Sequence, residues 1–447
     1  MSEYQPQLEQ VLSLLHSGDA QKAFKTFRPI LSYPGLVEQP AEFSETLQAL
    51  AEISMYIGEP QFASRLRSAS RTPADVNQLH RVGFEMINHG LNDMAATVLA
   101  YAHRLDPDNA EVLHELSASL GNGMRYAEAR SFLQESPRFV QHDFLACYLL
   151  TFNSLMSGDL EIPHRLLPEL RRLQAKDASF AQMTERITTQ LARADALTGH
   201  TSLDSHDLRG WHLVLTGSLL LHLSPHGYHE SMYGRYAWVQ DSYGLCLLGI
   251  LRIQAVLKAL QIRISRIWLL PDRNSQILAH AAARILDLPL KPWPKDGSQA
   301  SGLIVAYDLN QLDGDTLVSL MYHRPGQILW SHATCWTKGQ PSTADLTTFL
   351  YQKNTEPWGE QLIVDTENHQ PTHRPVDQRD PTIIAAELTA AKPVESLPED
   401  EPELLTLAQT AALAGDNILA LSYEEGQREK QWAGSPVPST FFHQERS

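Results

Sequence analysis

Residues 73–109, PADVNQLHRVGFEMINHGLNDMAATVLAYAHRLDPDN, decide the fold of the first half of this chain. Apolar residues recur three and four positions apart on both sides of Gly90, which is the pattern of two amphipathic helices joined by a tight turn. Small residues at Gly83 and Ala95 let two helices approach closely. The stretch therefore predicts an antiparallel helix pair.

The turn glycine of this pair recurs along the first half of the chain. It is found at Gly18, Gly58, Gly90, Gly123 and Gly158, with successive spacings of 40, 32, 33 and 35 residues. Self-similarity at a fixed period of this size is typical of stacked helix-pair units, each of which buries its apolar face against the next. The spacing predicts a helical repeat array.

Residues 4–175 resemble the tetratricopeptide-repeat (TPR) family. Val82 and Gly83 stand for the Leu-Gly of that family, and Ala95, Ala102 and Pro107 match its small and proline positions. The resemblance implies an α-solenoid over residues 1–200 whose groove binds a protein or peptide partner. A generic antiparallel helical bundle is the alternative.

The candidate groove residues are Asn77, His80 and Arg81, because a groove that clamps a peptide carboxylate needs amide and cationic side chains on its first helices. The competing interpretation of these three residues is a solvated helix face.

Composition excludes several classes of function. The chain has 447 residues, 52 acidic against 36 basic, and a formal net charge of −16. This disfavours general nucleic-acid binding and binding to anionic membranes, which both need a cationic surface. The three cysteines are too few and too widely spaced for a disulfide framework. With no signal peptide and no apolar run that spans a bilayer, a cytoplasmic location is expected.

The second half of the sequence has a different hydrophobic pattern from the first half. Short apolar runs at 211–223, 266–270, 303–307 and 327–335 predict strands, and residues 244–260 and 275–286 predict helices between them. This alternation predicts a mainly parallel α/β sandwich domain over 205–365, so the whole chain is expected to be α + α/β. Residues 366–447 are expected to form a Pro-rich acidic linker and a helical, partly disordered tail.

Ligands of parallel sheets sit beyond the carboxyl ends of the strands, which directs attention to three loops. The first, after Leu223, holds His226, His229 and Arg235 in a segment rich in tyrosine and glycine. Loops of this composition often bind ligands, although an ordered structural loop is the simpler interpretation. Two histidines give too few ligands for zinc, so no metal site is predicted.

The second loop, PDRNSQ, leads from a strand into an Ala-rich helix. Asn274 or Ser275 is expected to cap that helix, whose N-terminus then offers free N–H groups to an anion, with Arg273 adding positive charge. A surface turn with an ordinary cap is the alternative.

The third loop, YDLNQLDGDT, resembles the diphosphate-ribose loop of type I phosphoribosyltransferases. Asp308 matches the first acid of that motif, Gly314 one glycine, and Thr316 the threonine. The resemblance implies a phosphate- or nucleotide-containing ligand. Leu309 replaces the second acid and Asp315 the second glycine, which argues against an active phosphate site because a carboxylate repels phosphate.

The function expected from these signals is that of a protein-interaction adaptor or scaffold with a degenerate ligand-binding α/β domain. No catalytic residue is assigned and no cofactor is required. The alternative is a phosphoribosyltransferase-like or nucleotide-binding enzyme or sensor whose repeat array recruits a protein substrate. A structural module of a larger assembly is a third possibility.

Overall fold

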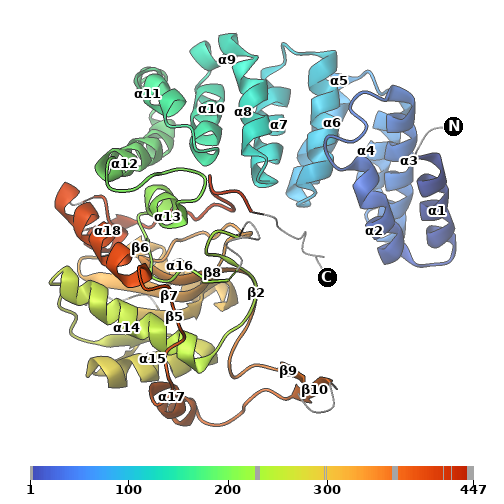
Figure 1. The fold of residues 1–447 in the computed structure, drawn as a ribbon. Helices are drawn as coiled ribbons and strands as arrows, with labels where there is room; N and C mark the ends of the chain where they lie inside the picture. The colour runs from blue at the N-terminus through green and yellow to red at the C-terminus, as the bar shows by residue number, and fades with distance from the viewer. Residues whose placement is uncertain are drawn as a thin grey trace. The chain divides into compact units, whose positions relative to one another are not determined.

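The computed structural model describes residues 4–226, 232–295, 297, 300–364, 371–415, 417–423 and 425–439. The chain divides into two compact units, Met1–Ile187 and Thr188–Ser447, of which the first is helical and the second is built on a sheet (Figure 1). No helix in the described ranges combines the length and the apolar character needed to cross a bilayer.

The first unit is a series of antiparallel helices. In chain order they are α1 (Gln5–His16), α2 (Ala20–Leu31), α3 (Pro40–Tyr56), α4 (Pro60–Arg71), α5 (Val76–Asn88), α6 (Asn92–Leu105), α7 (Ala110–Asn122), α8 (Tyr126–Gln134), α9 (Pro137–His142), α10 (Phe144–Met156) and α11 (Glu161–Gln174), with α12 (Ala181–Leu197) crossing the boundary between the units. Each helix packs on its sequence neighbours, and apolar side chains from Leu8 to Ala129 form one continuous core.

The turns between paired helices carry the repeated feature of the sequence. Gly18, Gly58, Gly90 and Gly158 have φ between 72° and 88°, a left-handed conformation that glycine adopts without strain. The fourth turn differs from the prediction, because Met124, at φ 60°, and not Gly123, takes this position. The corrected spacings are 40, 32, 34 and 34 residues.

The expected close approach inside the predicted pair is confirmed. A Cβ placed on Gly83 of α5 would lie 2.5 Å from Leu99 Cγ of α6, so only glycine fits there without movement. Ala95 and Ala102 of α6 are fully buried in the same core.

The second unit contains a parallel sheet. Its strands are β1 (Leu219–Leu220), β2 (Tyr236–Gln240), β3 (Ile267–Leu269), β4 (Leu290–Pro292), β5 (Gly302–Asp308), β7 (Gln327–Cys335) and β8 (Leu346–Thr355). The order is β1-β8-β7-β5-β3-β4, with β2 also paired to β8, and every pairing is parallel. The mainly parallel α/β domain predicted from the sequence is confirmed at this level.

Helices and a second apolar cluster cover the sheet. The helices are α13 (Leu208–Thr216), α14 (Tyr243–Ala259), α15 (Arg273–Leu286), α16 (Gly314–Leu320), α17 (Pro381–Thr389) and α18 (Asp400–Ala414). Two small antiparallel pairs complete the unit: β6 (Tyr322–His323) with β11 (Gly426–Gln427), and β9 (Gln361–Val364) with β10 (Pro371–Arg374). All side chains of β5 and β7 are buried, as expected for strands covered on both faces.

The strand predicted at 211–223 is wrong for most of its length. Asp207 caps α13 by accepting a hydrogen bond from Gly210 N at 2.8 Å, and Gly217, at φ 71°, ends the helix. Every residue of α13 is buried, including the polar Arg209, His212 and Thr216, so the helix has no solvent-exposed face, and its apolar run reads like a buried strand. Only the two residues of β1 form a strand within this stretch.

Candidate functional site

The carboxyl ends of β3 and β5 lie where the winding of the sheet reverses. The chain leaves β3 for β4 on one side and returns through β5 on the other. Parallel sheets bind ligands beside such a reversal. Here Tyr307 N donates to Ser275 Oγ at 2.9 Å and Asn274 Nδ2 donates to Gln311 Oε1 at 2.7 Å. The second and third predicted loops therefore meet.

The cap of α15 is not the one expected. Asp272 Oδ1 accepts a hydrogen bond from Ser275 N at 2.8 Å, so Asp272, and neither Asn274 nor Ser275, is the N-cap. A capping side chain accepts from an N–H two or three residues later, which the Asp272–Ser275 spacing satisfies. Ser275 is buried, and Asn274 Oδ1 accepts from Trp358 Nε1 at 2.6 Å.

Arg273 holds a neighbouring segment in place. Its Nη2 donates to the carbonyl oxygen of Asp377, at 2.8 Å, and to that of Arg379. Both carbonyls belong to the stretch between β10 and α17. Through Nη2 the guanidinium thus holds the backbone of this neighbouring segment.

The third loop is a compact, internally bonded turn. Asp308 is buried, and its carboxylate accepts hydrogen bonds from Asn310 N, at 2.9 Å, and from the Tyr351 hydroxyl. Burial raises the pKa of this carboxyl group, although the hydrogen bonds act in the opposite direction. Gly314 begins α16, and Thr316 uses both its N–H, at 2.9 Å, and its hydroxyl, at 2.8 Å, on the carboxylate of Asp313. The backbone and side-chain donors of Thr316 are therefore both bonded to Asp313.

The first loop contributes elsewhere. His226 is exposed, and His229 lies outside the described residues. Arg235 is buried and donates to the hydroxyl groups of Ser439, at 2.5 Å, and Ser435. Its partners come from the C-terminal segment and not from the second and third loops.

A buried polar cluster around Asp241 lies at the carboxyl ends of the strands. Asp241 follows β2 and its Oδ2 accepts from Tyr307 OH at 2.8 Å, from His332 Nε2 at 3.1 Å and from Cys246 Sγ at 3.4 Å. Its Oδ1 accepts from Ser242 N at 2.6 Å. The carboxylate thereby joins β2, α14, β5 and β7.

None of Asp241, Cys246 and His332 was among the site residues predicted from the sequence; Cys246 lies five residues after Asp241 within a helix, and His332 lies 91 residues after it. The signal that points to Asp241 is an acid at a strand end directly before a capping serine. Oxygen, sulfur and nitrogen donors of Asp241, Cys246 and His332 lie within 4.8 Å of one another, a set that a transition metal such as zinc accepts. Within the described ranges, these are the residues that could hold a metal.

The cluster is poorly arranged for acid–base catalysis. His332 is fully buried and its Nε2 is bonded to Asp241. A Cβ on Gly249 of α14 would lie 3.1 Å from His332 Nδ1, so the second nitrogen faces a helix and not a ligand. A general base must reach the proton that it removes. Nε2 is bonded to Asp241, and Nδ1, which has no hydrogen-bond partner among the described residues, is buried against α14.

A cleft of about 860 Å³ opens beside Asp241. It is bounded by the start of α14 and by the segments that follow β8 and β10. Arg379 on its wall is paired with Asp377, at 2.7 Å, and with Glu387, at 2.5 Å. Arg374 is exposed and donates only to Gln361 Oε1, at 3.2 Å, so it is the cation of the cleft that has no carboxylate partner among the described residues.

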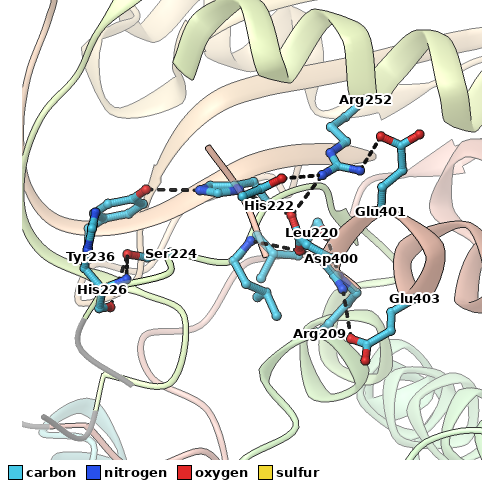
Figure 2. A network of polar contacts seen from close by, with 12 residues as sticks. Arg209, Leu220, His222, Ser224, His226, Tyr236, Arg252, Asp400, Glu401 and Glu403 are labelled. Atoms are coloured by element: carbon cyan, nitrogen blue, oxygen red, sulfur yellow. Dashed lines mark hydrogen bonds and ion pairs between the residues drawn. The ribbon is translucent and has the colours of Figure 1, made fainter. Parts of the chain in front are cut away.

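A second buried network lies around Asp400, the first residue of α18. Figure 2 shows Arg209, Arg252 and His222 converging on its carboxylate, with Arg252 Nη2 and His222 Nδ1 both at 3.3 Å. Burial is the largest effect and raises the pKa of Asp400, but His222 and Arg209 together bring that pKa below its usual value. The network fixes an acidic segment of the tail to the sheet unit.

In the helical unit the three predicted groove residues lie on α5. Asn77 and Arg81 are exposed, and His80 is half-buried with its Nε2 lacking a partner in the described structure. Phe84, one turn after His80, is 48% exposed. A hollow of about 790 Å³ elsewhere in this unit is lined by the loop after α2, the end of α6, and α8 and α9, and by none of these four residues.

The chain matches no protein-family model and has no significant match among curated proteins.

Proposed function

We propose that the chain is a protein-interaction adaptor whose helical unit binds a short segment of a partner protein on the exposed face of α5. The observation that carries this proposal is a stripe of Asn77, Arg81 and Phe84. Their spacings of four and three residues place them on one helix face, while Leu79, Val82, Gly83 and Met86 bury the opposite face. An exposed aromatic ring next to hydrogen-bonding groups is a common anchor for a peptide.

The TPR-like solenoid belongs to the same proposal. Left-handed turns spaced by 32, 34 and 34 residues and the close Gly83–Leu99 contact support it. In that architecture the first helices of successive pairs line one surface, which would extend the site from α5 to α3 and α7.

The test is a selection of peptides from a random display library on the full chain, followed by anisotropy measurements with the selected peptides. Phe84→Ser and Arg81→Glu are expected to weaken binding at least tenfold. Leu105→Ser is the matched control, because Leu105 on α6 is 41% exposed but lies outside the stripe. Equal weakening by Leu105→Ser and Phe84→Ser, or no selected peptide, would contradict the proposal.

A second candidate function is binding of a phosphate- or nucleotide-containing ligand by the sheet unit, as the resemblance to phosphoribosyltransferases implies. The cleft beside Asp241 supports this candidate, because it combines the start of α14 with Arg374 at the carboxyl ends of β2 and β8. If the sheet unit is an enzyme that acts on such a ligand, the helical unit would recruit its protein substrate.

Thermal unfolding of the full chain with nucleoside mono- and diphosphates tests this candidate. A saturable rise in Tm that Arg374→Ala removes and Arg263→Ala keeps is expected, since Arg263 is an exposed arginine outside the cleft. An unchanged Tm with every nucleotide would exclude this second function while leaving the adaptor proposal standing.

A further inference from the structure

Arg235 is a buried arginine without a carboxylate partner among the described residues. Its side chain is 2% exposed, its Nη1 and Nη2 donate to the hydroxyl groups of Ser439 and Ser435, and its guanidinium lies 4.9 Å from the centre of the Trp336 ring. The other arginines buried to this degree in the sheet unit are paired with Glu429, Asp400 or Asp345. Among the described residues of the sheet unit, Arg235 is therefore the arginine buried to this degree that has no carboxylate partner.

A small cavity adjoins this guanidinium. Its volume is about 30 Å³, and its polar wall includes Arg235, His212 and Trp336 together with Thr216, Gln431 and Ser435. Three buried nitrogens on these residues have no hydrogen-bond partner in the described part of the chain: Arg235 Nε, Trp336 Nε1 and His212 Nε2. Much of the remaining wall is apolar, including Leu208, Leu215 and Leu350.

An isolated charge in such surroundings is costly. Burial lowers the pKa of Arg235 to about 9, so the side chain still carries its proton at neutral pH. Burial and the charge of Arg235 lower the pKa of His212 to about 4, so this imidazole is neutral and adds no charge. One positive charge and unsatisfied N–H groups thus remain in an apolar pocket, where a paired anion would lower the free energy.

We propose that this cavity binds the carboxylate group of a small monoanionic ligand, with Arg235 Nε and Trp336 Nε1 as the donors. A water-sized group needs about 10–15 Å³, so the cavity admits about two or three heavy atoms, which is the size of a carboxylate group; the methyl group of acetate, its fourth heavy atom, would remain at the mouth of the cavity. Phosphate has more atoms and brings a second negative charge that nothing here neutralises. The site goes beyond the proposed function and does not depend on the helical unit.

The experiment titrates the full chain with acetate at neutral pH, with ionic strength kept constant by a bulky organic sulfonate. Thermal unfolding reports stabilisation, and tryptophan fluorescence reports the cavity directly because Trp336 and Trp432 line it. A saturable rise in Tm and a saturable fluorescence change with the same midpoint are expected. Formate is expected to act similarly, since the carboxylate is the recognised group.

Three variants decide the assignment. Arg235→Met is expected to abolish both effects, and Trp336→Phe, which keeps the ring but removes its N–H, to weaken acetate about tenfold. Arg263→Met, on an exposed arginine away from the cavity, should leave acetate binding unchanged. If Arg235→Met does not fold, Trp336→Phe carries the test alone.

The proposal is overturned if wild type shows no saturable response to acetate, or if Trp336→Phe binds acetate as wild type does. It is also overturned if chloride reproduces the response at lower concentration than acetate, because a halide and not a carboxylate is then the preferred anion.

Discussion

Asp241 shows at the scale of single residues how the sheet unit is held together. Four donors from three other residues and from the adjacent backbone converge on its carboxylate, and the residue is 3% exposed. Its negative charge is stable in this position only because these donors replace water. Burial and Asp241 together raise the pKa of Tyr307 and of Cys246 well above their usual values, so both remain protonated as donors.

We expect Asp241→Asn to destabilise the sheet unit by about 2–4 kcal/mol. The amide places an N–H group among donors and leaves buried hydrogen bonds unmade. Urea unfolding followed by tryptophan fluorescence measures the change. Asp315→Asn is the control: Asp315 is exposed on α16, so its change should stay within about 0.5 kcal/mol. Equal losses of stability in the two variants would show that the hydrogen bonds to Asp241 do not stabilise the sheet unit.

Residue positions were easier to predict from the sequence than residue contacts. Asp308, Asn274 and Ser275 do lie at strand or helix ends near the carboxyl edge, because local pattern sets where strands stop. Their partners could not be predicted, since Tyr351 and Trp358 come from distant parts of the chain. Asp272, which caps α15, lies two residues before Asn274, the nearer of the two expected caps.

At the scale of elements, the turns between helices follow the sequence closely, with one exception. In four of the five turns a glycine takes the left-handed conformation. In the remaining turn, between α7 and α8, Met124 takes it. The sequence could not show this shift, because Gly123 beside it satisfies the same spacing. A residue with a Cβ pays about 1–2 kcal/mol in this conformation.

Met124→Gly is therefore expected to stabilise the helical unit by about 0.5–1 kcal/mol, the relief of strain being partly offset by greater freedom of the unfolded chain. Differential scanning calorimetry measures the change. Met55→Gly is the matched control, since Met55 lies within α3 and its replacement should destabilise by about 1 kcal/mol. A loss of stability in Met124→Gly would mean that side-chain packing outweighs the backbone strain.

Helix α18 illustrates how an acidic stretch can be structural. Its first residue, Asp400, is 2% exposed and bonded to Arg209, Arg252 and His222, while Glu401 pairs with Arg252 at 2.6 Å (Figure 2). The acidic composition of this stretch indicated a solvated linker. The sequence did not show the ion pairs, because the arginines that bind these acidic residues lie about 150 and 190 residues earlier in the chain. Within the tail the structure places helices at 381–389 and 400–414.

The pH dependence of stability tests this network. The folded pKa of Asp400 is below its usual value of 3.8, so its contribution is fully present above that value and is lost as pH falls through the lowered pKa. Asp400→Asn should lower stability at pH 7 and flatten the loss of stability below about pH 4. Acid titration of urea midpoints measures both effects. Identical pH profiles for variant and wild type would contradict the assignment.

For the whole molecule, the sequence predicted a helical part followed by a parallel α/β part, and the structure has both. Periodicity and repeated turns determine these classes because they depend on local spacing. The α13 segment was assigned wrongly because it is buried on all sides. The Asp241 cluster and the Arg235 cavity depend on residues brought together only by the sheet order, which no local pattern specifies.

Hydrogen exchange of the full chain, with and without a selected peptide, tests whether the α5 face of the helical unit binds a partner segment. We expect added protection to centre on residues 76–88 and to extend to the neighbouring helices α3 and α7, with no change in residues 188–447. Protection confined to residues 188–447, or absent from 76–88, would contradict this proposal.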